Sequence, residues 1–383
     1  MAVLKVETHG QVFTPSAVVK QMLALRHNEG RVLEPSCGDG AFSSQIPGCV
    51  ALELDAEHVP PGALQMDFFE FPVAEKFATI IGNPPYIRHQ DILPETKALL
   101  DYSLFDLRSN LYLFFIEKCV HHLEDGGELI FIVPREFIKA TAAAKLNQFL
   151  YENGTITHFI ELGDARVFQG AVPNTVIFRY EKGLFKRALE DGRVFSLHNG
   201  QLLFTRDEMG GSLGDLFFVK VGAVSGADQV FEHSRGNQEF VCSTTIDTGA
   251  TRRMFYNKAA PELEPFKSAL LARGIRRFTE ANWWQWGRGF HESDAPRVYV
   301  NMKTRRPRPF FTHACKAYDG SVLALFSRSS TADMEKAASL LNEVPWEELG
   351  FVCDGRFLFS QKSLEGTPLP SAIYRKLCAA LGS

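Results

Sequence analysis

The first half of the chain is dominated by short apolar runs that alternate with stretches of helical periodicity. We expect strands at residues 32–34, 49–54, 78–81, 128–134, 156–162 and 174–181, and helices at 109–123 and 140–152. Strands that alternate with helices predict a mainly parallel sheet covered by helices on both faces. Ligands of such sheets bind beyond the carboxyl ends of the strands, so the turns after Glu34, Glu53 and Ile81 are expected to share one functional edge.

The run ending at Ile81 leads directly into Gly-Asn-Pro-Pro-Tyr at residues 82–86. Pro84 and Pro85 each fix their own φ and restrict the preceding residue, so the loop is stiff. The Asn83 side-chain oxygen and the Pro84 carbonyl are placed to accept the two hydrogens of a planar amino group, and Tyr86 is placed to stack on the ring that bears it. The loop therefore favours group transfer to an exocyclic or amide nitrogen. An ordinary Asn-Pro turn is the simpler interpretation.

Acidic residues end the neighbouring strands in an order typical of a nucleoside site. Glu34 precedes a glycine turn that contains Gly38, and Glu53 lies nearly twenty residues later, where an acid holds ribose hydroxyls in Rossmann-like folds. Asp67 could accept from an adenine amino group while Phe68 packs on its ring. A carboxylate beside the turn disfavours pyrophosphate and favours an ammonium, which indicates S-adenosylmethionine. The alternative for each piece alone is an ordinary Rossmann-like turn with surface acids.

Taken in order, these motifs resemble the amino-methyltransferases of DNA adenine, and more narrowly their TaqI-type (gamma) group. The likeness is clearest over residues 10–182 and weaker at 221–228 and 364–370. It implies an α/β fold: a class I S-adenosylmethionine-dependent methyltransferase domain with a Rossmann-like mixed sheet at residues 1–200, and a mostly β or mixed DNA-recognition domain at 201–383. The motifs that carry it are Gln-Val-Phe-Thr-Pro at 11–15, Glu-Pro-Ser-Cys-Gly-Asp-Gly at 34–40, Glu53, Asp67-Phe68, Asn-Pro-Pro-Tyr at 83–86, Asn-Leu-Tyr at 110–112, Gly-Gly at 126–127, Val-Pro at 133–134 and Arg-Val-Phe-Gln at 166–169, ahead of the strand at 174–178.

The resemblance also implies a role for each matching residue. The cofactor-binding set comprises Phe13, Thr14, Pro15, Glu34, Ser36, Cys37, Gly38, Glu53, Asp67 and Phe68. Within this set, residues 13–15 close over the methionine end of the cofactor. Glu34 binds the cofactor's ammonium group, and Glu53 binds its ribose. The catalytic set comprises Asn83, Pro84, Pro85 and Tyr86, and Tyr86 and Phe168 sandwich the target base.

The expected mechanism turns the adenine out of the duplex and transfers the methyl group directly. Rotating a base out of the stack costs a few kcal/mol, and stacking on an aromatic ring returns about 1–3 kcal/mol per base. The seven cysteines include none in the Pro-Cys context of a cytosine-methylating nucleophile and no Cys-x-x-Cys pair. We therefore expect neither a covalent enzyme intermediate nor a metal, and catalysis by positioning and electrostatics.

Charge is unevenly distributed along the chain. Residues 1–200 carry 18 Lys and Arg against 25 Asp and Glu, whereas residues 201–383 carry 23 against 20, and eleven basic residues face three acidic ones within 266–316. Such a stretch favours contact with phosphates, or is simply a solvated basic face. Trp283, Trp284 and Trp286 lie within it and are expected in the core. The predicted DNA contacts are Arg273, Arg276, Arg277, Arg288, Lys303, Arg305, Arg306 and Arg308.

Double-stranded DNA is thus the expected partner, and a separate restriction endonuclease acting on the same site is left open as a second one. The N-terminal residues show no signal peptide and no apolar run approaches a membrane span, so we expect a cytoplasmic, nucleoid-associated bacterial or archaeal protein without a membrane partner. Three alternatives remain open: a protein-glutamine N5-methyltransferase, an RNA adenine N6-methyltransferase, and a DNA-specificity protein without catalytic activity.

Overall fold

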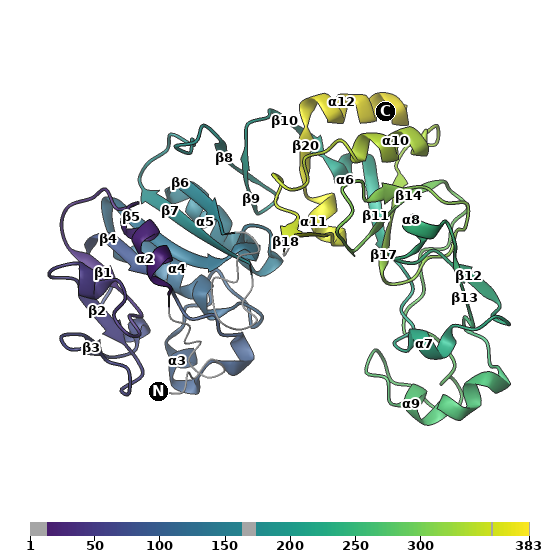
Figure 1. The fold of residues 1–383 in the computed structure, drawn as a ribbon, viewed down its shortest axis with the longest axis horizontal. Coiled ribbons are helices and arrows are strands. Elements are labelled where there is room, and N and C mark those ends of the chain that lie inside the picture. Colours follow the sequence, from purple (N-terminus) through teal and green to yellow (C-terminus); the bar gives the residue numbers. More distant parts are fainter. Residues whose placement is uncertain (1–13, 163–173, 354, 383) are drawn as a thin grey trace. The chain divides into compact units, whose positions relative to one another are not determined.

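The computed structural model describes residues 14–162, 174–353 and 355–382. It divides into two compact units, residues 1–206 and 207–383, which are described here one at a time (Figure 1). The sequence placed this division after residue 200. None of the helices in the described residues combines the length and the apolar character that a membrane crossing requires.

The first unit is built on a seven-stranded sheet in the order β3-β2-β1-β4-β5-β7-β6 (Figure 1). Strands β1 to β5 pair with one another in parallel, and β7 is inserted antiparallel between β5 and β6. This mixed sheet confirms the predicted fold class, that of class I methyltransferases. The elements of the unit are α2 (Ser16–Leu23), β1 (Val32–Glu34), β2 (Val50–Glu53), β3 (Leu64–Gln65), β4 (Phe77–Gly82), α3 (Pro94–Leu99), α4 (Leu111–His122), β5 (Leu123–Pro134), α5 (Ala144–Asn153), β6 (Gly154–Glu161), β7 (Thr175–Lys182), β8 (Val194–His198) and β9 (Gln201–Thr205), with 3₁₀ turns η1 (Ser43–Gln45), η2 (Phe68–Glu70), η3 (His89–Asp91), η4 (Arg135–Ile138) and η5 (Thr141–Ala143).

Alternating side chains of the central strands fill two separate cores. Ile80 faces the core that contains α4 and α5, whereas the next residue, Ile81, faces the core that contains α2. The same alternation continues in β5, because successive side chains of a strand point to opposite faces. Both faces of the sheet are therefore covered, as the apolar runs predict, and the polar edge of the parallel strands is left for ligands.

One boundary differs from the prediction. Residues 125–127, Asp-Gly-Gly, were expected to separate a helix ending at 123 from a strand beginning at 128, but β5 already begins at Leu123. Residues 124–127 form an irregularity in the pairing with β4, where Phe77 pairs with Leu123 and Thr79 with Glu128. Gly126 adopts φ +78°, a left-handed conformation that glycine accommodates without strain.

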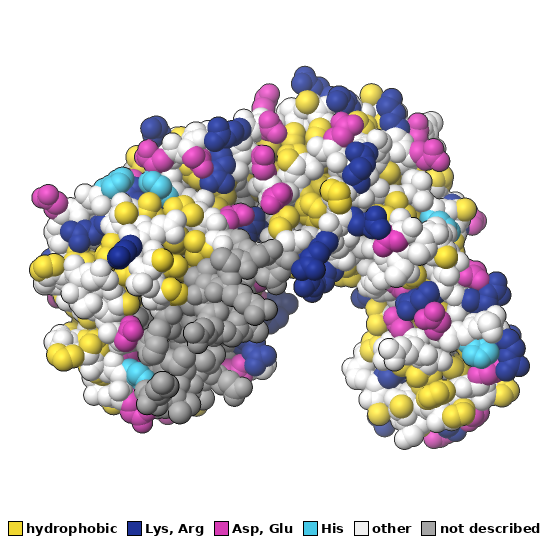
Figure 2. Space-filling model, in the orientation of Figure 1, with side chains coloured by type: hydrophobic (Ala, Val, Ile, Leu, Met, Phe, Trp, Pro, Cys, Tyr) yellow, Lys and Arg dark blue, Asp and Glu magenta, His cyan; other side chains and the backbone are white. Residues whose placement is uncertain are grey.

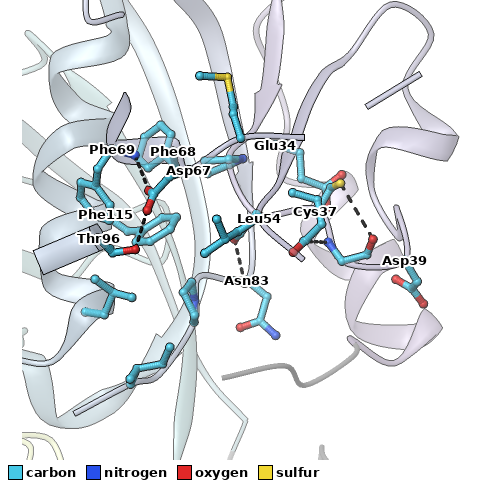
Figure 3. Close-up of a pocket in the computed structure, with 18 of the residues that line it drawn as sticks. Glu34, Cys37, Asp39, Leu54, Asp67, Phe68, Phe69, Asn83, Thr96 and Phe115 are labelled. Carbon is cyan, nitrogen blue, oxygen red and sulfur yellow. Dashed lines mark hydrogen bonds between the residues drawn. The ribbon is translucent and has the colours of Figure 1, made fainter. Parts of the chain in front are cut away.

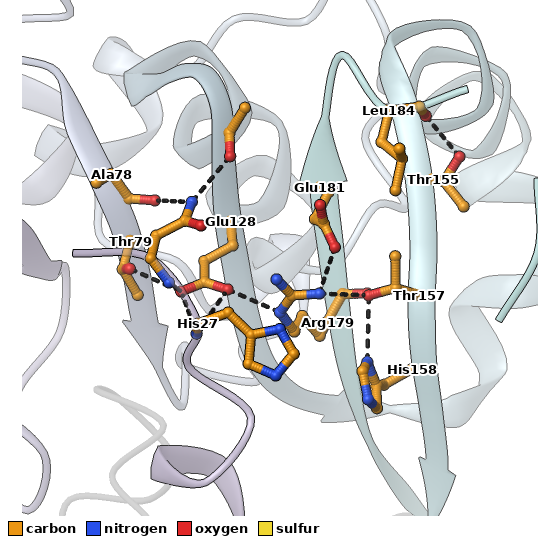
Figure 4. A network of polar contacts seen from close by, with 12 residues as sticks. His27, Ala78, Thr79, Glu128, Thr155, Thr157, His158, Arg179, Glu181 and Leu184 are labelled. Carbon is orange, nitrogen blue, oxygen red and sulfur yellow. Dashed lines mark hydrogen bonds and ion pairs between the residues drawn. The ribbon is translucent and has the colours of Figure 1, made fainter. Parts of the chain in front are cut away.

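A buried polar network joins side chains of β4, β5, β6 and β7 (Figure 4). The Glu128 carboxylate accepts from Arg179 Nε at 2.7 Å and from Thr79 Oγ1 at 2.9 Å. It also accepts from the main-chain amides of His27 and Asn28 at 3.0 and 2.9 Å. Glu128 is fully buried and Arg179 is 2% exposed, so this is an internal ion pair with satisfied partners.

The second unit is a mixture of short strands and short helices, as expected. Its largest sheet is antiparallel, in the order β11-β17-β14-β16. Trp283 and Trp286 are buried in a core of their own, which confirms their expected structural role. The elements are β10 (Met209–Ser212), α6 (Leu213–Leu216), β11 (Phe217–Val221), α7 (Asp228–Phe231), β12 (Gln238–Phe240), α8 (Thr245–Thr248), β13 (Arg252–Met254), η6 (Pro261–Phe266), α9 (Lys267–Leu271), β14 (Arg297–Asn301), β15 (Lys303–Thr304), β16 (Phe310–Phe311), β17 (Val322–Ser327), α10 (Met334–Leu341), β18 (Val352–Cys353), β19 (Arg356–Leu358), α11 (Gln361–Glu365), β20 (Pro368–Pro370) and α12 (Ser371–Leu381).

Candidate functional site

A pocket opens at the carboxyl ends of β1, β2 and β4, the edge where the turns were expected to meet (Figure 3). Its empty volume of about 940 Å³, part of it open to solvent, matches the upper range of small-molecule sites. Leu54 and Asn83 lie between a wall that carries Asp67 and a wall that carries Cys37 and Asp39 (Figure 3). The lining residues are Thr14, Glu34, Pro35, Ser36, Cys37, Gly38, Asp39, Ala41, Phe42, Glu53, Leu54, Met66, Asp67, Phe68, Phe69, Asn83, Pro85, Ile87, Ile92, Leu93, Thr96, Leu111 and Phe115.

The glycine turn after β1 is fastened to the end of β2. Cys37 N donates to Leu52 O at 2.8 Å, and Gly38 N donates to Glu53 Oε2 at 2.7 Å. Gly40 has φ +78°, and a Cβ there would meet Ser43 Oγ at 3.3 Å and Pro60 Cγ at 3.4 Å. The turn therefore requires glycine for both its conformation and its close packing.

Glu34 lies on the wall of the pocket and is almost inaccessible, with 1% of its surface exposed. Its Oε2 accepts from Ser43 N at 2.7 Å. Burial is the dominant influence and raises the pKa of Glu34 to about 8, against the lowering effect of the bonds from Ser43. A nearby cation would reverse this shift, so the carboxyl group is suited to an ammonium ligand.

The carboxylate of Glu53 is fixed by two main-chain amides. Gly38 N donates to one oxygen, as above, and Asp55 N donates to the other at 2.8 Å. Each oxygen retains a second lone pair for a ligand hydroxyl. Glu53 is thus a rigid acceptor at the end of β2, which is the geometry that a ribose diol requires.

Asp67 is oriented by two donors at the start of η2. Phe69 N donates to Oδ1 at 2.8 Å, and the Thr96 hydroxyl donates to Oδ2. The ring of Phe68 is 2% exposed and stacks on Phe115 with centroids 5.0 Å apart. Phe68 therefore belongs largely to the core, and Phe115 completes the apolar wall beside Asp67.

The Asn-Pro-Pro-Tyr loop leaves β4 at the lip of the same pocket. The Asn83 side chain donates from Nδ2 to Thr14 Oγ1 at 3.2 Å, and Ser36 Oγ donates to Asn83 O at 3.4 Å. Tyr86 donates its hydroxyl to Ile132 O at 2.8 Å, so its half-buried ring is fixed against β5. Burial holds the pKa of this hydroxyl well above its usual value, and it stays neutral.

Most of the predicted cofactor and catalytic residues lie on this one pocket. Among those that the structure describes, Pro15, Pro84 and Tyr86 do not line the pocket, although each is next in sequence to a residue that does. Phe13 and Phe168 lie outside the described residues, so their predicted roles stay predictions. Burial raises the pKa of the Cys37 thiol to about 12, so this pocket cysteine carries no nucleophilic thiolate at neutral pH.

Several residues that line the pocket were not predicted from the sequence. Leu54 is 42% exposed although it is apolar, and it follows Glu53 directly, so its position beside a predicted ribose ligand was an available signal. Thr96 and Phe115 come from α3 and α4, and no local pattern in the chain relates them to Asp67. Their contact with the site depends on tertiary packing alone.

The predicted DNA contacts separate into buried and exposed side chains. Arg273 is 9% exposed, and its guanidinium donates to main-chain carbonyls. Its prediction as a DNA contact is therefore wrong, and its role is structural. Arg306 forms an ion pair with Asp247. The remaining candidates are exposed: Arg276, Arg277, Arg288, Lys303, Arg305 and Arg308.

Comparison with known proteins finds that part of the chain is similar to enzymes of restriction–modification systems. Residues 57–168 match the family described as Eco57I restriction-modification methylase. The chain is 33% identical over 223 residues to the Type II methyltransferase M.HincII of Haemophilus influenzae, covering 55% of this chain and 43% of the relative. It is 35% identical over 206 residues to the Type II methyltransferase M.TthHB8I of Thermus thermophilus, covering 48% and 47%.

Among solved structures, a type I restriction-modification methyltransferase subunit of Streptococcus thermophilus aligns with a TM-score of 0.35 and 17% identity, over 51% of this chain and 50% of that one. The chain spans less than half the length of the two curated relatives named above. S-adenosylmethionine, the cofactor predicted from the motifs, is the one that the similarity to these methyltransferases implies. The resemblance to DNA methyltransferases that the motifs predict is confirmed, and this chain is similar to the methyltransferases of restriction–modification systems.

Proposed function

We propose that the protein is a site-specific DNA methyltransferase that transfers a methyl group from S-adenosylmethionine to N6 of an adenine turned out of the duplex. The observation that carries the proposal is the position of Asn83. Its side chain lines the same pocket as Glu34, Glu53 and Asp67, at the end of β4. A side chain suited to hold an amino group and carboxylates suited to bind a nucleoside thus line one pocket, which supports the proposal.

The pocket residues fit S-adenosylmethionine group by group. Glu53 offers fixed oxygens to the ribose, and Asp67 offers an acceptor to the adenine amino group between the apolar side chains of Leu54 and Phe115. Glu34 offers a buried carboxyl group to the ammonium. The cofactor supplies an electrophilic methyl group on a sulfonium.

The chain's own contribution to catalysis is to hold the target amine. Asn83 Oδ1 and the Pro84 carbonyl accept hydrogen bonds from the two N–H groups of the target amine. These bonds favour a more pyramidal nitrogen and direct its lone pair away from the ring. Pro84 and Pro85 keep this pair of acceptors rigid, so little reorganisation is needed at the moment of reaction. The nitrogen gains a methyl group and then loses one proton to solvent.

Tyr86 supplies one face for the extruded base. Its hydroxyl is tied to β5 and its ring packs edge-on against Tyr112, with centroids 5.9 Å apart. A ring held in this way loses little conformational freedom when a base stacks on it. Stacking of about 1–3 kcal/mol offsets much of the cost of extrusion.

The test is transfer of a tritiated methyl group by the full chain to duplex DNA, RNA and a release factor in parallel. We expect label in DNA, on adenine, and its near-complete loss in Asn83→Ala while calorimetry still detects cofactor binding. Gln90→Ala, an exposed amide outside the pocket, is the matched control and should retain activity. Label in RNA or in the release factor instead would support one of the alternative functions. Cofactor binding with no labelled substrate would overturn the proposal.

A further inference from the structure

The arginines of the second unit differ in what their guanidinium groups contact. Arg235, Arg253 and Arg306 form ion pairs with Glu262, Glu239 and Asp247. Basic and acidic side chains accordingly lie next to one another on the visible face of this unit (Figure 2). Within the described residues, Arg276 and Arg277 are exposed and form no ion pair, so their charge is not neutralised locally.

These two arginines belong to a loop, residues 272–287, whose main chain is held by hydrogen bonds from the buried side chain of Arg273. Arg273 donates to Leu270 O at 2.8 Å, to Ser225 O at 2.5 Å, to Trp283 O at 2.6 Å and to Gln285 O at 2.9 Å. Its guanidinium also lies 3.9 Å from the centroid of Phe278. Arg273, near the start of the loop, is therefore bonded to the main chain of the second half of the loop and to two carbonyls outside it.

Two tryptophans fix the second half of the loop. Trp283 and Trp286 are 3% and 2% exposed. Trp286 donates from Nε1 to Phe255 O at 2.9 Å, and its main-chain amide donates to Asn257 Oδ1 at 2.8 Å. Gln285 lies between these two tryptophans, so its main chain is held while its side chain remains half-buried at the surface.

Arg276 and Gln285 contact one another across this anchored loop. Arg276 Nη2 donates to Gln285 Oε1 at 2.8 Å, and the Arg276 guanidinium lies 5.1 Å from the centroid of Phe278. The guanidinium keeps its other N–H donors, and the Gln285 amide keeps its NH₂ group. The result is a pair of planar polar groups at the surface, an exposed guanidinium and a half-buried amide, in a defined orientation.

We propose that Arg276 and Gln285 together read base edges in the major groove of the target duplex. This rests on the proposed DNA methyltransferase function and names the side chains that set its sequence specificity. Arginine matches O6 and N7 of guanine, and glutamine matches N6 and N7 of adenine. Arg277, which lacks such a partner among the described residues, serves as a phosphate contact.

A phosphate contact alone does not account for the pair. A phosphate requires positive charge and tolerates a mobile side chain. Fixing a neutral amide beside the guanidinium adds no charge, but it reduces the conformational freedom lost on binding and sets the direction of the donors. That arrangement is useful where geometry discriminates between bases.

The experiment measures methylation by the full chain on a library of duplexes with randomised sequence, followed by sequencing of the methylated molecules. Arg276→Ala and Gln285→Ala should each reduce the preference for the cognate base pair over its substitutes about tenfold or more, at one or two positions of the site. Arg253→Gln, an exposed arginine already paired with Glu239, is the control and should leave the preference unchanged. Thermal midpoints and cofactor affinity show that each variant remains folded.

The outcomes separate this inference from the function on which it rests. A uniform loss of rate across all sequences, with unchanged preference, would identify Arg276 and Gln285 as phosphate or structural residues and overturn the inference. Unaltered rates and preference would place them outside the interface. Site-specific methylation by the wild-type protein in either case would leave the proposed function intact. Absence of methylation on every duplex would overturn both.

Discussion

The carboxyl group of Glu34 combines burial with a position on the cofactor pocket. Because burial raises its pKa to about 8, the group is mostly protonated in the free protein at pH 7. An ammonium ligand stabilises the carboxylate and lowers this pKa. If Glu34 holds the ammonium as proposed, binding displaces a proton and the affinity depends on pH.

Cofactor binding should release close to one proton at pH 7. The association constant of the cofactor should rise by up to about tenfold per pH unit between pH 6 and 8. The effect should level off above the pKa of the free group, where no proton remains to be displaced. Calorimetry of S-adenosylhomocysteine binding in buffers of different ionisation enthalpy measures the proton count. Glu34→Gln should abolish it, and a wild-type heat that is independent of the buffer would contradict the assignment.

The ring and the hydroxyl of Tyr86 have separable roles. Tyr86→Phe removes the bond to Ile132 O and should cost about 1 kcal/mol of stability while base stacking survives. Tyr86→Ala removes the stacking surface as well. With 2-aminopurine at the target position, fluorescence should report normal extrusion in the Phe variant and reduced extrusion in the Ala variant. Equal signals from all three proteins would argue against a stacking role.

At the scale of elements, the buried ion pair between Glu128 and Arg179 determines how β5 and β7 tolerate change. Glu128→Leu leaves the Arg179 guanidinium buried beside Thr157 and Glu181, without the fully buried carboxylate that pairs with its Nε. We expect a loss of about 3–5 kcal/mol in the free energy of unfolding. Urea denaturation followed by circular dichroism measures the change.

The double variant Glu128→Leu/Arg179→Met should recover part of that loss, because it removes both charges at once. Glu75→Gln provides the matched exposed case, since Glu75 pairs with Arg31 at the surface with side chains 44% and 53% exposed. It should cost no more than about 1 kcal/mol. A single Glu128 variant as stable as Glu75→Gln would show that the buried pair does not support the sheet.

The elements that the sequence predicted are those defined by local pattern. The apolar runs at 78–81 and 174–181 appear as β4 and β7, because each contains enough buried residues to mark a strand. β3 has two exposed residues and gave no such signal. The site follows the same rule: Glu53 ends one recognisable strand and Asn83 directly follows another, whereas Thr96 reaches Asp67 only through tertiary packing.

At the scale of the whole chain, the second unit was predictable in character but not in topology. β11 pairs with β17, some hundred residues later, and no short-range pattern specifies such a partner. Charge alone likewise misassigned Arg273, because a count of arginines does not distinguish a buried guanidinium from an exposed one. Burial and partners, which only the fold provides, separate the two kinds.

The acidic first half and basic second half lead to a prediction about ionic strength. DNA affinity of the full chain should fall steeply with salt, with log K decreasing by about 0.9 per log unit of salt for each phosphate contacted. Arg305→Ala and Arg308→Ala should each reduce this slope by about one if their exposed side chains contact phosphates. Fluorescence anisotropy of a labelled duplex at several salt concentrations measures it. Slopes identical to that of the wild type would exclude both residues from the interface.

The hydrogen bonds of Arg273 go to main-chain oxygens, and every residue supplies such an oxygen whatever its side chain. The hydrogen bonds from Arg273 therefore do not depend on which amino acids occupy positions 276, 277 and 285. Substitutions there alter the outward chemistry without disturbing the framework. On the proposed function, such a loop could acquire a new target base through few substitutions while Arg273 continues to hold its main chain.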